Sequence, residues 1–238
     1  MEIKNLRALR TVTQWLFILG LPWLLLSASI AGAVNSHWLY HYGFNKYNIS
    51  QTTGLTDAEL DNIAQGLINY FNSDEDYIRL TVEREGKPFP LFNQREIIHL
   101  RDVKGLFHRD YWVLLGTLAY ALSYIILSLL WRQDRRQLGW GLVGGGGLTL
   151  GVMLALGVGI LLNFDQLFWQ FHLISFANEL WQLDPTQDSL IQLFPGGFWY
   201  DAALFCVLFT TVGAVVVGGV GGYLLYRGAR PVDKGHYQ

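Results

Sequence analysis

The chain has 238 residues, of which 51% are hydrophobic and 15% charged, and its formal net charge is −2. This apolar share is too high for one or two soluble domains of that total length unless lipid solvates part of the surface. The near-neutral charge gives no support for a nucleic-acid partner. The single cysteine, Cys206, cannot form an internal disulfide, and we interpret it as a small packing residue.

Four stretches without charged side chains account for the apolar excess. Each has about the 20 residues that a helix needs to cross the hydrocarbon layer of a bilayer. The predicted membrane spans are 14–34, 111–131, 139–162 and 202–226. We expect the first stretch to remain as a helix, because it is longer than the apolar region of a usual cleaved signal peptide.

Basic residues before the first span, between the second and third, and after the fourth predict that both ends are cytoplasmic. These residues are Lys4, Arg7, Arg10, Arg132, Arg135, Arg136, Arg227, Arg230 and Lys234. Segment 163–201, in contrast, contains no lysine or arginine. We therefore place loop 132–138 and tail 227–238 in the cytoplasm, and segments 35–110 and 163–201 outside.

Segment 35–110 is predicted to form a small α+β cap outside the membrane. Residues 55–72 have an apolar helical face, and Thr56 and Glu59 match a capping box. Alternation over 77–83, a turn at 85–88 and a return over 89–92 predict a β-hairpin.

Two further features of the cap bear on function. Residues 37–42, HWLYHY, are typical of an aromatic belt at a membrane surface. His37 and His41 are one helical turn apart, a spacing that suits a metal pair, but interfacial histidines are common and the chain has no HExxH motif. We predict no metal there. A helix over 94–110 then leads into the second span, with Gly105 as its weak point.

Glycines recur inside the third and fourth spans. Gly147 with Gly151, and Gly218 with Gly222, match the small-xxx-small spacing that lets helix backbones approach closely. Because they lie inside apolar stretches, we interpret them as packing residues and not as a phosphate-binding loop.

Segment 163–201 mixes many aromatic residues with acidic and amide side chains, which is typical of a segment that lies in the membrane interface. If 165–179 is helical, Asp165, His172 and Glu179 share one face. Elsewhere, His99 has Asp102 three residues later and Arg95 four residues earlier, so these three could also share a face. By position alone, both histidines are more often surface or packing residues than catalytic ones.

Two motifs change that balance. The sequences REIIHLRDVKGL (95–106) and FWQFHLISFANELWQLDPTQDSLIQLFP (168–195) resemble the two signature regions of the lipoprotein intramolecular transacylase (Lit) family of bacterial membrane proteins. The order of spans and loops is also similar, so that the resemblance covers nearly the whole chain. The sequence departs from the family pattern at Glu179, where an aspartate is expected, and at Gly196 and Gly197.

The resemblance implies a mainly α membrane protein, with four helices and both ends inside, that transfers an acyl chain within a diacylated bacterial lipoprotein. The acyl chain moves from the sn-2 oxygen of the diacylglyceryl group, which the lipoprotein's N-terminal cysteine bears, to the α-amino group of that cysteine. The resemblance also implies two catalytic histidines, here His99 and His172, no metal or organic cofactor, and a site at the outer face of the cytoplasmic membrane, in contact with membrane lipids. We favour a monomer.

For this chemistry we expect Asp102 to orient His99, and Arg101, Lys104 and Asn178 to contact the oxyanion or the headgroup, with Asp165 in a supporting place near His172. Which histidine acts as base stays open. A straight helix would hold His99 well above Tyr111, whereas a glycerol ester lies near the interface, so segment 94–104 must fold back at Gly105. Two other hypotheses remain: a lipid-ester hydrolase that uses the same histidines, and a non-catalytic protein that binds lipid or peptide. A transporter is disfavoured because the spans contain no ionisable side chain.

Overall fold

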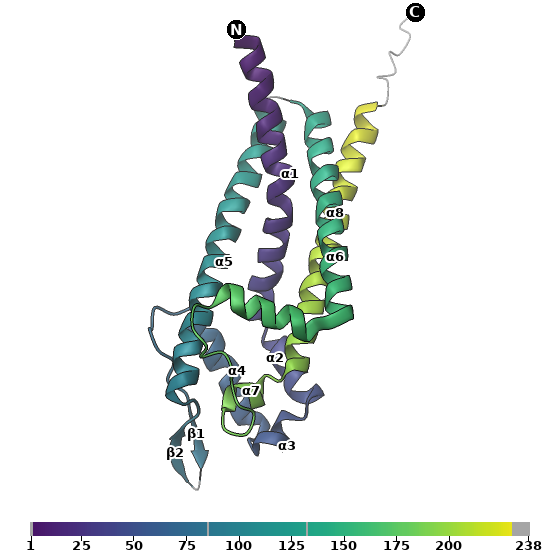
Figure 1. The fold of residues 1–238 in the computed structure, drawn as a ribbon. Coiled ribbons are helices and arrows are strands. Elements are labelled where there is room, and N and C mark those ends of the chain that lie inside the picture. The colour runs from purple at the N-terminus through teal and green to yellow at the C-terminus, as the bar shows by residue number, and fades with distance from the viewer. Residues whose placement is uncertain (1, 85, 132, 230–238) are drawn as a thin grey trace, which may run out of the picture. The chain divides into compact units, whose positions relative to one another are not determined.

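The computed structural model describes residues 2–84, 86–131 and 133–229 (Figure 1). Four long helices hold the apolar stretches: α1 (Glu2–Val34), α5 (Gln94–Ile126), α6 (Arg135–Ser175) and α8 (Gly196–Ala229). Each is long and apolar enough to cross a membrane. A short π-helix, η1 (Leu127–Trp131), follows α5. The predicted mainly helical chain with four candidate spans is confirmed, while Arg132 and tail residues 230–238 lie outside the described residues.

The chain divides into two compact units. The first unit comprises Met1–Ala28, Val113–Leu156 and Val207–Gln238, and therefore holds one part of each long helix. Its buried core consists of Phe17, Leu21, Ala121, Tyr124, Leu138 and Leu142. Large apolar side chains of this unit stay exposed, for example Trp23 at 62% and Leu130 at 75%. A soluble monomer rarely exposes so many such side chains, whereas lipid would solvate them.

Glycines bring the backbones of α6 and α8 close together within the first unit. A Cβ added at Gly146 would lie 2.9 Å from the carbonyl oxygen of Ala214. One added at Gly221 would lie 2.8 Å from the carbonyl oxygen of Gly139. The expected pair of Gly147 and Gly151 is wrong, because an added Cβ there would meet no atom of the described residues within 4 Å.

The second unit comprises Ser29–Trp112 and Gly157–Cys206. Besides parts of the long helices, it holds five short elements and one medium helix. They are α2 (His37–Lys46), α3 (Ile49–Thr53), α4 (Asp57–Phe71), β1 (Thr81–Arg84), β2 (Lys87–Pro90) and α7 (Ser189–Leu193). Buried side chains from α2, α4, α7 and the first turn of α8 form one continuous hydrophobic core.

Local sequence signals explain the start of α4. Glu59 N donates to Thr56 Oγ1 (3.3 Å), and Thr56 N donates to Glu59 Oε2 (2.8 Å), so the predicted capping box is present.

The predicted β-hairpin is also present, with Thr81 opposite Pro90 and Val82 opposite Phe89. It begins at Thr81 and not at residue 77, and Gly86 takes the positive φ (+74°) that the turn requires.

Helix α2 replaces the aromatic belt predicted for 37–42. Ser36 caps it by accepting a hydrogen bond from Leu39 N at 3.3 Å. Leu39 and Tyr40 are buried in the hydrophobic core, while Trp38 is exposed. The surface prediction was therefore wrong for the side chains that the core needs, because aromatic residues suit a packed interior as well as an interface.

Candidate functional site

A bend in α6 shapes the site. Asn163 leaves helical geometry (φ −161°, ψ 80°), and its side-chain Oδ1 accepts a hydrogen bond from Gln166 N at 3.1 Å. Asn163 thus acts as the N-cap of a new helical segment that runs to Ser175. Figure 1 shows this segment (green) running across toward the part of α5 that belongs to the same unit.

His99 on α5 and His172 on the bent part of α6 lie together. Their ring centroids are 6.3 Å apart with an angle of 27° between the planes, and Phe176 contacts both rings. Both imidazoles are buried, with His99 6% and His172 9% exposed. The predicted fold-back at Gly105 is wrong, because α5 stays helical from Gln94 to Ile126. The bend at Asn163 brings the histidines together instead.

His172 has a defined tautomer when neutral. Its Nδ1 lies 2.7 Å from the carbonyl oxygen of Phe168, which can only accept a hydrogen bond. Nδ1 therefore carries the proton, and Nε2 keeps a lone pair. The rings of Phe168 and Trp181 pack against the imidazole at centroid distances of 4.4 and 4.8 Å. These contacts hold the ring in one orientation, as a base requires.

His99 is held differently. Its Nδ1 is buried and has no hydrogen-bond partner among the residues that the structure describes. Leaving a buried polar atom unpaired costs about 1–3 kcal/mol, and such an atom calls for an explanation. A polar group of a bound substrate would satisfy this nitrogen.

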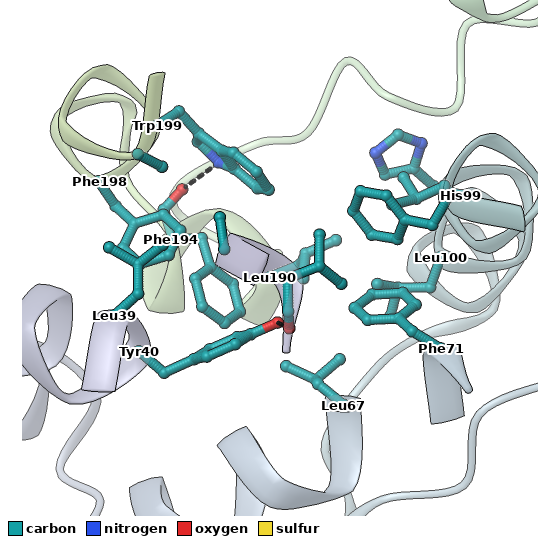
Figure 2. Close-up of a pocket in the computed structure, with 15 residues that line it drawn as sticks. Leu39, Tyr40, Leu67, Phe71, His99, Leu100, Leu190, Phe194, Phe198 and Trp199 are labelled. Carbon is teal, nitrogen blue, oxygen red and sulfur yellow. Dashed lines mark hydrogen bonds between the residues drawn. The ribbon is translucent and has the colours of Figure 1, made fainter. Parts of the chain in front are cut away.

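An apolar pocket begins beside His99. Its cavity volume is about 90 Å³, within an opening of about 620 Å³ that includes space open to the surroundings. Figure 2 shows His99 on the α5 side and Trp199 on the opposite side. Fifteen residues line the pocket. Two of them use their polar side-chain groups in hydrogen bonds to backbone carbonyls. The hydroxyl of Tyr40 donates to Val34 O (3.2 Å), and the indole N–H of Trp199 donates to Phe194 O (3.1 Å). His99 therefore brings to this lining a buried polar atom, Nδ1, that has no hydrogen-bond partner among the described residues.

Asp102 and Asn178 bond to each other. Asn178 Nδ2 donates to Asp102 Oδ2 at 2.7 Å, and Asn178 Oδ1 accepts from Leu180 N at 3.0 Å. The predicted Asp102–His99 hydrogen bond is not among those of the described residues. The Asp102–Asn178 bond instead ties α5 to the segment that follows α6.

The two predicted cationic contacts have other partners. Lys104 is buried and donates to Glu75 O (2.7 Å) and Ser73 Oγ (3.2 Å). Arg101 donates to the hydroxyl of Tyr77 at 3.3 Å and lies over its ring. Both therefore hold α5 to the segment before β1, and the expected oxyanion role is not supported by these contacts.

The polar face predicted for 165–179 is only partly formed. Asp165 and His172 lie on the same helical segment, but Asp165 is exposed. Helix α6 ends at Ser175, so Glu179 leaves the helix, and its carbonyl oxygen accepts from Arg95 Nη2 at 3.0 Å. The prediction was wrong for Glu179 because the helix stops one turn earlier.

One buried carboxylate was missed from the sequence. Glu96 is 1% exposed; its Oε1 accepts from Leu190 N (2.6 Å) and its Oε2 from Asn93 N (2.7 Å). Asn93 also accepts from Glu96 N at 3.1 Å and donates to Asp188 Oδ1 at 2.7 Å. This network joins the start of α5 to α7, and both helices line the pocket. The Asn-x-x-Glu spacing at 93–96, a capping-box pattern, was the signal that could have revealed it.

Comparison with known proteins points to one family. The family model described as lipoprotein intramolecular transacylase Lit matches residues 15–199. The structure of the membrane-integral Lit from Bacillus cereus is 22% identical, with a TM-score of 0.80 over 93% of this chain and 98% of that chain. Two variants of that protein, in which a histidine is replaced by alanine or by arginine, give TM-scores of 0.78 at 22% identity, over 96% of this chain and 99% and 98% of theirs.

A curated relative also matches. An uncharacterized protein of Aquifex aeolicus (strain VF5) is 27% identical over 128 residues, which are 53% of this chain and 54% of that protein. The match thus spans about half the length of this relative. The solved structures establish the likeness of fold, and the family model covers most of the chain. On these grounds the chain belongs to the lipoprotein intramolecular transacylase (Lit) family.

Proposed function

We propose that this protein catalyses an acyl transfer within a diacylated bacterial lipoprotein. The acyl chain leaves the sn-2 oxygen of the diacylglyceryl group and joins the α-amino nitrogen of the same cysteine, giving the lyso form. A C–N bond forms, a C–O bond breaks, and the amine proton ends on the sn-2 oxygen. The pairing of buried His99 and His172 beside an apolar pocket, in a chain of this family, carries the proposal.

His172 is the proposed general base. The α-amino group of a peptide has a pKa of about 7.7–8.0, so much of it is protonated at neutral pH and must lose a proton to attack an ester. The Nε2 lone pair of His172 can accept a proton, because Nδ1–H is engaged by Phe168 O.

His99 is the proposed partner of the ester. With a proton on Nδ1, it would donate to the ester oxygens as negative charge develops, and this would satisfy a nitrogen that has no partner among the described residues. Nucleophile and electrophile belong to one molecule, so holding them in the reactive orientation supplies much of the rate. The apolar lining would receive an acyl chain and exclude the water that competes with the amine.

The proposed setting is the bacterial cytoplasmic membrane. The basic residues near the predicted inner ends of the spans favour cytoplasmic termini. The proposed site would then lie at the outer face, where its lipoprotein substrate would be. Membrane lipids would contact the exposed apolar side chains, and we propose a monomer.

Mass spectrometry of a lipoprotein's N-terminal peptide tests this function. The lipoprotein is isolated from cells that lack other N-acylation enzymes, with and without this protein. We expect one acyl chain to move from glycerol to the amine at unchanged mass. His99→Ala and His172→Ala should abolish the shift, whereas His108→Gln, which replaces a histidine that bonds Phe71 O further along α5, should keep it.

Two outcomes would contradict the proposal. Loss of one acyl mass would identify a hydrolase that uses the same histidines. An unchanged peptide, despite confirmed expression of the protein, would favour a lipid- or peptide-binding protein.

A further inference from the structure

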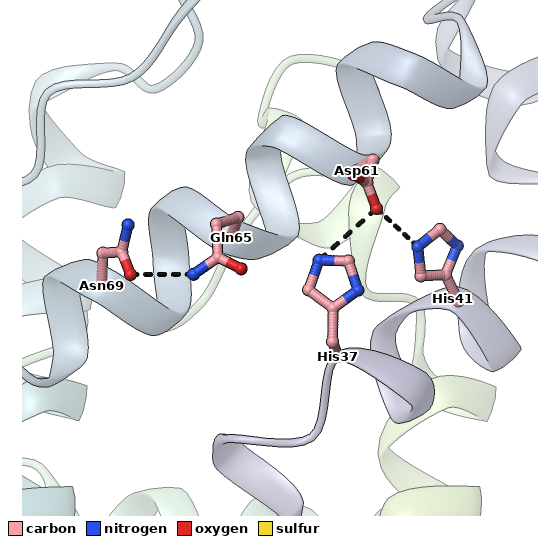
Figure 3. A network of polar contacts seen from close by, with 5 residues as sticks. All are labelled: His37, His41, Asp61, Gln65 and Asn69. Atoms are coloured by element: carbon pink, nitrogen blue, oxygen red, sulfur yellow. Dashed lines mark hydrogen bonds and ion pairs between the residues drawn. The ribbon is translucent and has the colours of Figure 1, made fainter.

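Two histidines of α2 converge on one carboxylate of α4. His37 and His41 are one turn apart, with ring centroids 4.9 Å apart. Oδ1 of Asp61 lies 2.6 Å from Nε2 of His41 and 3.4 Å from Nε2 of His37 (Figure 3). The three ligand atoms all lie within 4.8 Å of one another. The sequence showed the histidine pair but not this third group, which is 20 residues further on.

These spacings suit a small divalent cation. Zn²⁺ binds histidine nitrogen and carboxylate oxygen at about 2.0–2.2 Å, so neighbouring ligand atoms of a tetrahedral site lie about 3.3–3.5 Å apart. The distance from His37 to Asp61 is already 3.4 Å. That from His41 would lengthen by about 0.7 Å, a small movement for side chains that are partly exposed.

The ligand-bearing turns are held in place by their own caps. Ser36 caps α2 immediately before His37, and the Thr56–Glu59 box fixes the first turn of α4, which leads directly into Asp61. Both helices then pack into the hydrophobic core of the second unit. Such supported side chains form a binding site with little reorganisation.

We propose that His37 Nε2, His41 Nε2 and Asp61 Oδ1 bind Zn²⁺, with a water as fourth ligand. Imidazole with one carboxylate selects zinc-like ions, whereas Mg²⁺ and Ca²⁺ prefer sites made of oxygen. The two elements that the ion joins also form the pocket wall, α2 through Leu39 and Tyr40 and α4 through Leu67. The ion therefore acts as a clasp between these helices, separate from the catalytic pair.

Metal titration of the full-length protein in detergent tests this clasp. The affinity tag is removed and the protein is stripped with chelator. Zn²⁺ should bind at one equivalent and raise the midpoint of thermal unfolding, because a ligand that binds only the folded state stabilises it. Co²⁺ should give the visible absorption bands of a tetrahedral site. His41→Ala and Asp61→Asn should each abolish the bands and the rise in midpoint.

Three controls keep the test specific. Gln65→Ala changes the next turn of the same α4 face (Figure 3), where Gln65 bonds Asn69, and should keep the Co²⁺ bands. The double variant His99→Ala/His172→Ala should also keep them, which separates this site from the buried histidine pair. His37→Gln, a milder change, should weaken binding even if another variant folds poorly. The clasp is refuted if wild-type protein binds less than one equivalent, or if His41→Ala and Asp61→Asn bind as wild type does.

Discussion

The two catalytic candidates differ in how the protein holds their ring nitrogens. His172 is fixed through Nδ1 by a backbone carbonyl, and this leaves Nε2 as an acceptor. His99 has a buried Nδ1 without a partner among the described residues. This asymmetry is the basis for assigning the base to His172 and the ester contact to His99.

Replacing either histidine should remove proton transfer from the same transition state. We expect His172→Ala and His99→Ala each to lower kcat/KM by about 10²–10⁴-fold, and the double variant to lose little more, because groups that act as one unit are not additive. Initial rates with a synthetic diacylated lipopeptide measure this. Fully multiplicative losses in the double variant would argue against a joint mechanism.

Buried Glu96 supports the pocket but is not among the residues that line it. Both of its carboxylate oxygens accept hydrogen bonds from backbone N–H groups. In Glu96→Gln, the side-chain NH₂ group would face one of these N–H groups, and that hydrogen bond would be lost. We expect a loss of about 1–3 kcal/mol in unfolding free energy. Thermal unfolding in detergent checks this, with Glu75→Gln at an exposed position as control. Equal midpoints for the two variants would show that the network contributes nothing.

At the scale of elements, the long helices and the capped helix were predictable, because span length and the Thr56–Glu59 pattern are local signals. The bend in α6 was not, although the third span was expected to end at residue 162. The sequence showed a polar residue at 163 but not that its side chain would cap a helix continuing in a new direction. Helix α2 was missed because its aromatic residues suit an interface and a core equally well.

Backbone contact between α6 and α8 makes a matched pair of glycines informative. Gly146→Ala should lower the thermal midpoint, since its Cβ would meet Ala214 O at 2.9 Å, and overpacking costs about 1–3 kcal/mol. Gly147→Ala faces no described atom within 4 Å and should leave the midpoint unchanged or slightly higher. The same drop for both substitutions would contradict this packing.

The capping box of α4 predicts a dependence on pH. Hydrogen bonds from the backbone and hydroxyl of Thr56 lower the pKa of Glu59 below its usual value. A lowered pKa means that the box stabilises the fold above the unfolded-state pKa of about 4.3, and that this contribution is lost as pH falls through the folded-state pKa. Glu59→Gln should therefore lower the thermal midpoint at pH 7 and lose that difference from wild type at low pH. A difference that stays constant with pH would exclude the linkage.

At the scale of the whole molecule, the four candidate spans and the family were predictable from apolar length and two long motifs. The contacts around the histidines were not. Asp102, Arg101 and Lys104 are close to His99 in sequence, yet their bonds go to Asn178, Tyr77 and Glu75. Spacing along a helix predicts a shared face, but the partner of a polar side chain depends on which distant segment packs there.

The most direct test of the central claim is a single-turnover reaction in H₂¹⁸O. Purified protein is mixed in detergent with a synthetic diacylated lipopeptide, and the masses of the products are measured by mass spectrometry. Acyl transfer through the histidine pair predicts an N-acylated product of the same mass as the substrate, with no ¹⁸O in any product. His172→Ala should form almost none of this product in the time that the wild type needs to complete one turnover. Free fatty acid that carries ¹⁸O, formed at the rate of substrate loss, would show that water attacks the ester and would contradict intramolecular transfer.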